Sequence, residues 1–151
     1  MKLPSTLAIT ALSAFAVAAV ANAYLCKYCG KEYGSLSMLT ANDCHRHPSG
    51  ANKGKHAVFQ GTGVDQDGKP AFLCKLCGKQ YSSLPVLTAN DCPRHPDGAN
   101  KGKHSAYEGS IKSAYECEHC GKQYSSIAMM TANDCARHPN GANKGKHSPS
   151  R

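Results

Sequence analysis

Tryptophan is absent from the 151-residue chain, and aromatic residues make up only 7% of it. Much of the apolar content lies at one end, because residues 1–23 are mostly alanine and aliphatic side chains. The remainder contains too little bulky apolar material to bury one core of ordinary domain size. The composition therefore excludes an ordinary single-core enzyme.

A second long apolar run is also absent, so we expect no transmembrane segment in the mature chain. The first run extends from Leu7 to Val20 behind the basic residue Lys2, and a small-x-small site, Ala21-Asn22-Ala23, follows it. This run is shorter than the roughly 20 residues of a membrane span. The pattern predicts a signal peptide over residues 1–23 and export to a periplasmic or extracellular location after cleavage near Ala23. An uncleaved membrane anchor is the alternative.

The rest of the chain is one pattern written three times, with first cysteines at Cys26, Cys74 and Cys117. Such internal repetition indicates small repeated modules. We expect module 1 over residues 24–59, a linker over 60–71, module 2 over 72–107, a linker over 108–114 and module 3 over 115–151. The linkers contain glycine, serine and charged residues and differ in length, which is typical of flexible tethers. We therefore favour beads on a string over a stacked solenoid, and whether the modules pack together is left open.

Each module keeps three cysteines and two histidines at matching positions. They are Cys26, Cys29, Cys44, His47 and His56 in module 1, Cys74, Cys77, Cys92, His95 and His104 in module 2, and Cys117, Cys120, Cys135, His138 and His147 in module 3. His45 and His119 have no histidine counterparts in the other modules. We expect these two to be plain surface residues.

The number of cysteines is odd, with three per module and nine in the chain, so they cannot all pair as disulfides. A tetrahedral zinc site instead takes three thiolates and one imidazole, and the C-x2-C and C-x2-H spacings are typical of zinc modules. Each module is shorter than the roughly 40 residues below which a chain usually needs a staple. Zinc can supply it, so we predict about three ions, one per module. Iron–sulfur ligation and a redox-active C-x-x-C pair are the alternatives.

The first half of each module resembles the Krüppel-type C2H2 zinc finger. The residues that carry the resemblance in module 1 are Cys26, Cys29, Gly30, Lys31, Tyr33 and Leu39. The resemblance implies a β-hairpin bearing the first two cysteines, packed through Tyr33 and Leu39 onto a short helix. It then fails, because Asn42 stands where the family has its first zinc histidine, and Cys44 has no equivalent there.

The residues themselves favour the same local structure. Gly30 follows the second cysteine, where a tight turn is needed. Ser35 precedes a short apolar pattern in which Leu36 and Leu39 lie on one helical face, and modules 2 and 3 repeat this pattern. Proline is tolerated only in the first helical turn, so Pro85 places the start of the second helix near residues 82 and 83. We expect the helix of module 1 to end at Asn42 in a left-handed cap. The predicted fold class is small metal-stabilised α+β modules, three tandem units that are zinc-finger-like or zinc-ribbon-like.

Two histidines in each module compete to be the fourth ligand. His47 forms a C-x2-H pair with Cys44, and the equivalent segment of module 2, Cys92-Pro93-Arg94-His95, is similar to half of a zinc ribbon. His56 closes an Asn-Lys-Gly-Lys-His run that is the same in all three modules. We favour His56, His104 and His147, with His47, His95 and His138 as alternative ligands or as donors behind the site.

Charge constrains the partners. The formal net charge of +8 falls once Lys2 is removed and zinc thiolates form, which leaves only weak attraction for nucleic acid or an anionic surface. The predicted helices, residues 36–42, 84–90 and 127–133, lack Arg, Lys and Gln, the usual readers of base edges, so sequence-specific DNA recognition is disfavoured. A closed metal site also leaves no open position for catalysis, which argues against an enzyme.

Three functions fit these observations. The favoured one is an exported, non-enzymatic zinc-binding protein whose modules bind an unknown protein or surface polymer multivalently. The second is a zinc-buffering protein, in which the metal is the cargo. The third is a nucleic-acid-binding zinc-finger protein.

Overall fold

The computed structural model describes residues 23–151. The predicted signal peptide over residues 1–23 lies outside this range but for Ala23. Within the described range, no helix has the length and apolarity that crossing a membrane requires.

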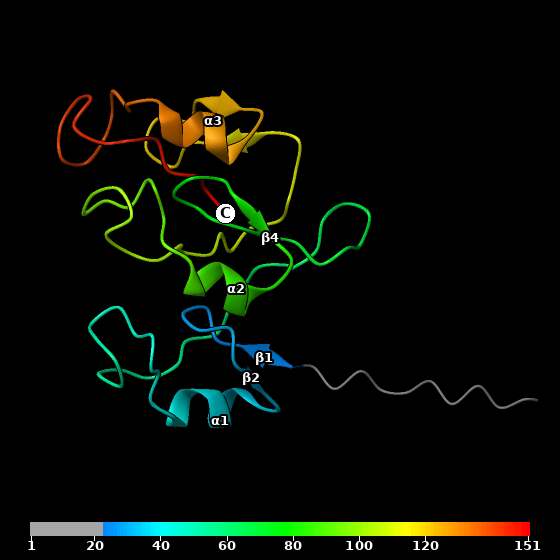
Figure 1. Cartoon of the computed structure of the whole chain (residues 1–151). Helices are drawn as coiled ribbons and strands as arrows, with labels where there is room; N and C mark the ends of the chain where they lie inside the picture. Colours follow the sequence, from blue (N-terminus) through cyan, green and yellow to red (C-terminus); the bar gives the residue numbers. More distant parts are fainter. Residues whose placement is uncertain (1–22) are drawn as a thin grey trace, which may run out of the picture.

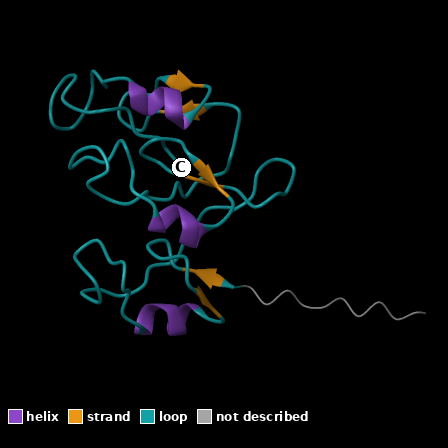
Figure 2. Ribbon diagram, viewed as in Figure 1, coloured by secondary structure: helices purple, strands orange, loops and turns teal. Residues whose placement is uncertain are grey.

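Each module consists of a two-stranded antiparallel hairpin followed by one short helix (Figure 2). Module 1 contains β1 (Tyr24–Leu25), β2 (Glu32–Tyr33) and α1 (Leu36–Ala41). Module 2 contains β3 (Phe72–Leu73), β4 (Gln80–Tyr81) and α2 (Leu84–Ala89). Module 3 contains β5 (Tyr115–Glu116), β6 (Gln123–Tyr124) and α3 (Ile127–Ala132). The predicted fold class, small α+β modules, is confirmed.

The hairpins and helix starts follow the local chemistry of the sequence. Gly30 adopts φ +73°, and its N–H donates to the Cys26 carbonyl, which closes the turn between β1 and β2. Ser35 caps α1 by accepting a hydrogen bond from the Met38 N–H at 3.2 Å. Pro85 lies in the first turn of α2, as its sequence position predicts.

The helix ends differ from the prediction. Asn42 is extended (φ −95°, ψ 148°), so the left-handed cap expected there is wrong. The Asn42 side-chain amide instead donates to the Met38 carbonyl. The backbone carbonyl of Asn42 accepts a hydrogen bond from the His56 N–H at 3.1 Å. The left-handed asparagine is Asn52 (φ 58°), whose N–H donates to the Cys44 carbonyl. These bonds fold the second half of the module back onto the end of its helix.

The three modules stack, and the expectation of independent beads is wrong. In Figure 1, α2 lies between the hairpin of module 1 and that of module 2. A backbone bond from the Phe59 N–H to the Leu25 carbonyl brings these two side chains together, and both pack on the core of module 2 around Leu84. The physical reason is that module 1 has no other element to cover its apolar end, so the next helix covers it.

The junction between modules 2 and 3 repeats the same contacts. Leu73 and Tyr107 of module 2 pack against the core that contains Ile127. Arg94 donates to the Ala128 carbonyl and to the Thr131 hydroxyl, as Arg46 does to the Pro85 carbonyl and the Thr88 hydroxyl in the first junction. The modules therefore share one geometry of stacking.

Close approach of the backbone also contributes to each junction. A Cβ at Gly30 would overlap the ring of Pro85, and one at Gly78 would overlap the backbone of Ala128. Gly30 and Gly78 thus serve both their own turns and the contact with the next helix.

Both linkers make contacts of their own within the folded chain. Residues 60–71 form a bend in which Val64 pairs with Pro70, and Asp65 accepts hydrogen bonds from the N–H groups of Asp67 and Lys69. In the second linker, the Glu108 carboxylate lies 3.6 Å from the Lys27 ammonium group of module 1.

Candidate metal centre

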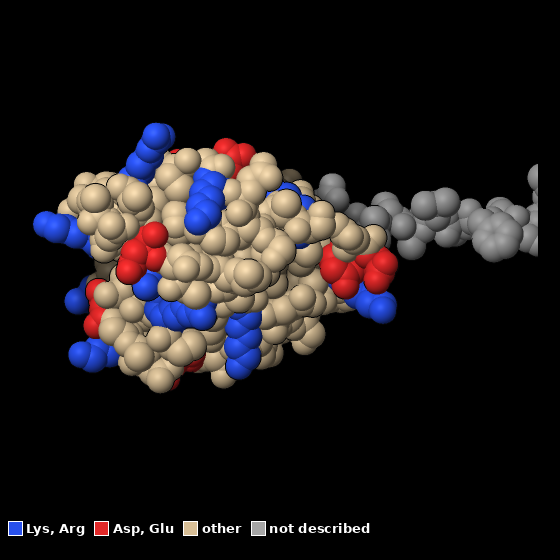
Figure 3. All heavy atoms as spheres, turned by 90° about the horizontal axis from the view of Figure 1, so that it is seen from above, with Lys and Arg blue, Asp and Glu red and all other residues tan. Residues whose placement is uncertain are grey.

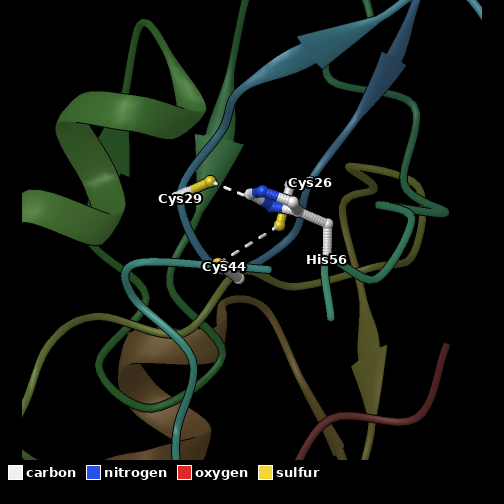
Figure 4. A group of neighbouring side chains, drawn as sticks. All are labelled: Cys26, Cys29, Cys44 and His56. Atoms are coloured by element: carbon white, nitrogen blue, oxygen red, sulfur yellow. Dashed lines mark hydrogen bonds between the residues drawn. The ribbon is translucent and has the colours of Figure 1, made fainter. Parts of the chain in front are cut away.

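The three cysteines and the last histidine of each module lie close together and form one cluster. In module 1, Cys26 and Cys29 lie on the knuckle between β1 and β2, Cys44 follows α1, and His56 ends the returning loop. Figure 4 shows their side chains converging from these different segments. One ligand atom from each lies within 4.8 Å of all the others.

The distances fit a tetrahedral zinc ion. The Sγ atoms of Cys26 and Cys44 are 3.9 Å apart, and the Sγ of Cys29 lies 3.5 Å from Nδ1 of His56. With zinc at about 2.3 Å from sulfur and about 2.0 Å from nitrogen, a tetrahedron separates two sulfurs by about 3.8 Å and sulfur from nitrogen by about 3.5 Å. A disulfide would instead need sulfurs about 2.05 Å apart.

Modules 2 and 3 have the same arrangement. Cys74 and Cys92 are 3.9 Å apart, and Cys77 lies 3.4 Å from Nδ1 of His104. In module 3 the corresponding distances are 4.0 Å and 3.4 Å, within the group Cys117, Cys120, Cys135 and His147. The chain therefore has three Cys3His sites, one per module, which are compatible with three zinc ions.

Burial of the thiols makes a bound cation important. Burial raises the pKa of Cys44, and likewise of Cys92, to about 12, although the backbone N–H groups of Arg46 and Arg94 oppose the shift. Burial also raises the pKa of Cys117, but a hydrogen bond with the His147 side chain and hydrogen bonds from backbone N–H groups outweigh it and lower that pKa to about 6 in the absence of metal. Three buried thiolates can coexist only beside a cation, and zinc supplies that charge.

Two of the ligand histidines, His56 and His104, have environments that favour the neutral form required of a zinc ligand. Burial lowers the pKa of His56 and of His104, and the nearby ammonium groups of Lys31 and Lys79 lower each further. Because Nδ1 faces the sulfur cluster, the ring proton belongs on Nε2. In module 2 this nitrogen lies 2.9 Å from the Tyr81 hydroxyl, to which the neutral ring donates.

Tyrosine is the residue that sequence reasoning assigned only to packing. Tyr33 and Tyr124 hold the position of Tyr81, with ring centroids 5.1 Å from those of His56 and His147, and their buried hydroxyls have no hydrogen-bond partner among residues 23–151. A partner behind the ligand histidine fixes its orientation at many zinc sites. Only Tyr81 makes this hydrogen bond, whereas ring packing against the ligand histidine is common to all three modules, and the constant position of the tyrosine was the available sign of that packing.

The other histidine that all three modules share lies outside the cluster of ligands. The ring of His47 lies against Gly54, where any Cβ would overlap it, and its Nδ1 accepts a hydrogen bond from the Ser49 N–H at 3.2 Å. His95 and His138 lie in the same way on Gly102 and Gly145. This packing explains why glycine stands between the two lysines of each Lys-Gly-Lys run.

The two unmatched histidines differ from each other. His45 is exposed, as expected. His119 is half-buried, and its ring contacts that of His138 edge-on at a centroid distance of 5.3 Å. His119 is therefore more than a plain surface residue.

Comparison with known families agrees with the first half of the module. The family model of the C2H2-type zinc finger matches residues 23–41 and 71–89. Both matches end before Asn42 and Asn90, where the ligand pattern departs from that of the family. No curated protein and no solved structure matches the chain. The chain is a zinc-binding tandem array of three zinc-finger-like modules, in which the second half of each module adds one cysteine and one histidine to the two cysteines of the first half and completes a Cys3His ligand set.

Proposed function

We propose that this chain is an exported, non-enzymatic protein in which zinc holds each module together and the stacked modules present a repeated surface to a partner. The observation that carries the proposal is the closed ligand set. Each site brings together four protein donors, and eleven of the twelve ligands are buried, with Cys120 half-buried. A site of this kind leaves zinc no open position for substrate or water, which is typical of structural zinc.

The helices support a role other than reading DNA bases. α1, α2 and α3 contain no Arg, Lys or Gln. Their large exposed side chains are apolar, namely Leu36, Met38, Val86 and Met129. In addition, α2 and α3 are each covered on one side by the preceding module. These features disfavour the insertion of a helix into the major groove.

Export is supported by the composition of residues 1–23, with Lys2, the uncharged run and the small-x-small site. Repetition favours binding by avidity, because a polymer or clustered partner can engage several modules at once. A zinc-buffering role would need the metal to leave readily, and burial of the ligands opposes this.

The proposal can be tested on the protein isolated from its own host by intact native mass spectrometry, with thiols counted after denaturation. We expect a chain that begins near Tyr24, carries three zinc ions and has nine free thiols. A chain that begins at Met1 would contradict export. Disulfides without zinc would contradict the metal-stabilised array.

A second measurement separates structural zinc from zinc as cargo. Zinc loss to a chelator should proceed at the rate at which the modules unfold, as followed by hydrogen exchange on the same sample. Rapid exchange of zinc from modules that remain folded would favour the buffering role and contradict the proposal.

A further inference from the structure

Two equivalent grooves run between neighbouring modules. Groove A, of about 630 Å³, lies between modules 1 and 2 and is lined by Lys27, Arg46, His47, His95, Lys101 and Lys103. Groove B, of about 790 Å³, lies between modules 2 and 3 and is lined by Lys75, Arg94, His95, His138, Lys144 and Lys146. The grooves exist because the modules stack, and no single module contains either of them.

The lining of groove B is cationic. No Asp or Glu of the described chain lines it. Lys146 pairs with Asp134 at 2.8 Å, but neither Lys75 nor Lys144 forms an ion pair among residues 23–151. Among residues 23–151, no carboxylate therefore pairs with Lys75 or Lys144, although Glu118 lies 3.6 Å from Nε2 of His119 and Asp97 lies 3.5 Å from Nδ1 of His95, two histidines that line groove B.

Groove A is lined by the equivalent residues of the neighbouring modules but carries less positive charge. Asp97 lines it, whereas its counterpart in groove B is Asn140. Lys27 also lies 3.6 Å from the Glu108 carboxylate, and Lys103 pairs with Asp91 at 2.8 Å. The two grooves thus offer a comparison within one molecule, between equivalent lining positions that carry different charge.

The cationic groups of groove B are held in place by the stack. Arg94 is fixed by bonds from one terminal nitrogen to the Ala128 carbonyl and the Thr131 hydroxyl, which leaves other guanidinium N–H groups free to donate. The aliphatic part of Lys144 lies against Gly141, which has φ +117°. The segments that follow α1, α2 and α3 form the loops at the left in Figure 1, and several basic side chains project from the same side in Figure 3.

The grooves suit a thin anionic chain better than a nucleic acid. Among the described residues, groove B offers unpaired bases no Phe, Tyr or Trp on which to stack, only the smaller imidazole rings of its histidines, and groove A adds the single tyrosine Tyr28. A duplex would have to rest on outer faces such as the helices, which carry no basic residue. Carboxylate or sulfate groups on a single polysaccharide chain need only the ammonium and guanidinium groups that the grooves offer.

We propose that groove B, and more weakly groove A, binds an anionic polysaccharide, with both grooves engaging one chain. This inference rests on the proposed role of the array as a multivalent binding unit. Because both grooves contribute, affinity should increase with polymer length more steeply than for a single site.

The test uses the zinc-loaded chain from Tyr24 to Arg151 and measures binding by isothermal titration calorimetry at several salt concentrations. The probes are dextran sulfate, polygalacturonate, uncharged dextran, single-stranded DNA and duplex DNA. We expect binding to at least one of the two anionic polysaccharides, weakening as salt increases, and none to uncharged dextran.

Matched charge reversals locate the site. K75E/K144E should weaken binding at least tenfold, and K27E/K101E in groove A should weaken it less. The control K69E/K112E makes the same change in net charge at exposed linker positions and should change binding less than twofold. Equal loss in all three variants would show attraction to net charge alone and overturn the proposal.

Two further outcomes would also overturn it. Tighter binding of either DNA than of both polysaccharides, lost in K75E/K144E, would assign the groove to nucleic acid. Absence of binding to both anionic polysaccharides would reject the groove as a site. Native mass spectrometry of each variant checks for three zinc ions, so that failure of the groove is distinguished from failure of the metal-stabilised array.

Discussion

The helices α1 and α2 occupy the same position in their modules, but only α2 lies inside the stack. Leu36 begins α1 and is 45% exposed, whereas Leu84 begins α2 and is fully buried. Thr40 is exposed in α1, and its counterpart Thr88 is buried and accepts a hydrogen bond from Arg46. The same short helix therefore contributes differently to stability according to whether a preceding module covers it.

The metal sites show no such difference between the end and the interior of the stack. Distances between the ligand atoms agree among the three modules to within about 0.1 Å. Zinc thus organises each module by itself, while the side chains at the junctions organise the modules relative to one another. The following predictions separate these two levels.

The largest effect is expected from removing a metal ligand inside the stack. Cys92→Ser should leave two zinc ions in the chain, because a structural site contributes on the order of 10 kcal/mol of apparent binding energy. Loss of module 2 removes a partner from both junctions, so amide exchange should accelerate in all three modules. Native mass spectrometry and hydrogen exchange measure the two effects.

Cys44→Ser is the matched variant at the end of the stack. It should also leave two zinc ions, but amide protection should persist in module 3. Equal loss of protection in module 3 for both variants would show that the stack unfolds as one unit and would remove the distinction between module and junction.

The two histidines of module 1 test the assignment of the ligand, and the smaller effect is expected for His47, which lies outside the cluster. His56→Ala should lose most zinc from module 1, because only three donors remain there. His47→Ala should keep three zinc ions and lower the free energy of unfolding by about 1–3 kcal/mol, since a cavity opens beside Gly54. Zinc stoichiometry distinguishes the variants, and the reverse pattern would assign the ligand role to His47.

The sequence was sufficient for the parts of each module that depend on neighbouring residues. Gly30, Ser35 and Pro85 fix a turn, a cap and a helix start through local backbone chemistry, and the structure has these features where expected. Spacing did not separate His47 from His56, because the difference depends on how the loop returns. Backbone bonds from Cys44 to Gly54 and from His56 to Asn42 decide that path, and they are not visible in the spacing of ligands.

Stacking was missed for a different reason. Leu25 and Phe59 are isolated apolar residues near the two ends of module 1, and neither forms a periodic apolar face in the sequence. Their importance depends on the backbone bond that places them together and on the helix that then covers them. Side chains that act only between modules carry little local pattern, so sequence reasoning assigned the modules to a flexible string.

Truncating the first residue of each helix tests the contrast between α1 and α2 directly. Leu84→Ala should lower the free energy of unfolding by about 2–5 kcal/mol, because the side chain is fully buried between two modules. Leu36→Ala should change it by less than about 0.5 kcal/mol, as is usual for exposed positions. Urea unfolding at fixed free zinc measures both, and similar losses would show that α1 is covered in solution.

The smallest effect is expected from the arginine of each junction. Arg94→Ala removes the bonds to the Ala128 carbonyl and the Thr131 hydroxyl, and we expect a loss of about 1 kcal/mol because the side chain is otherwise exposed. Arg137 has the same position in module 3 but faces no further module among residues 23–151, so Arg137→Ala should be near neutral. Both variants should keep three zinc ions, because neither arginine is a ligand. A loss that is equal for Arg94 and Arg137 would place the effect inside the module, through the loop after its third cysteine, and would remove the arginine from the account of how the modules stack.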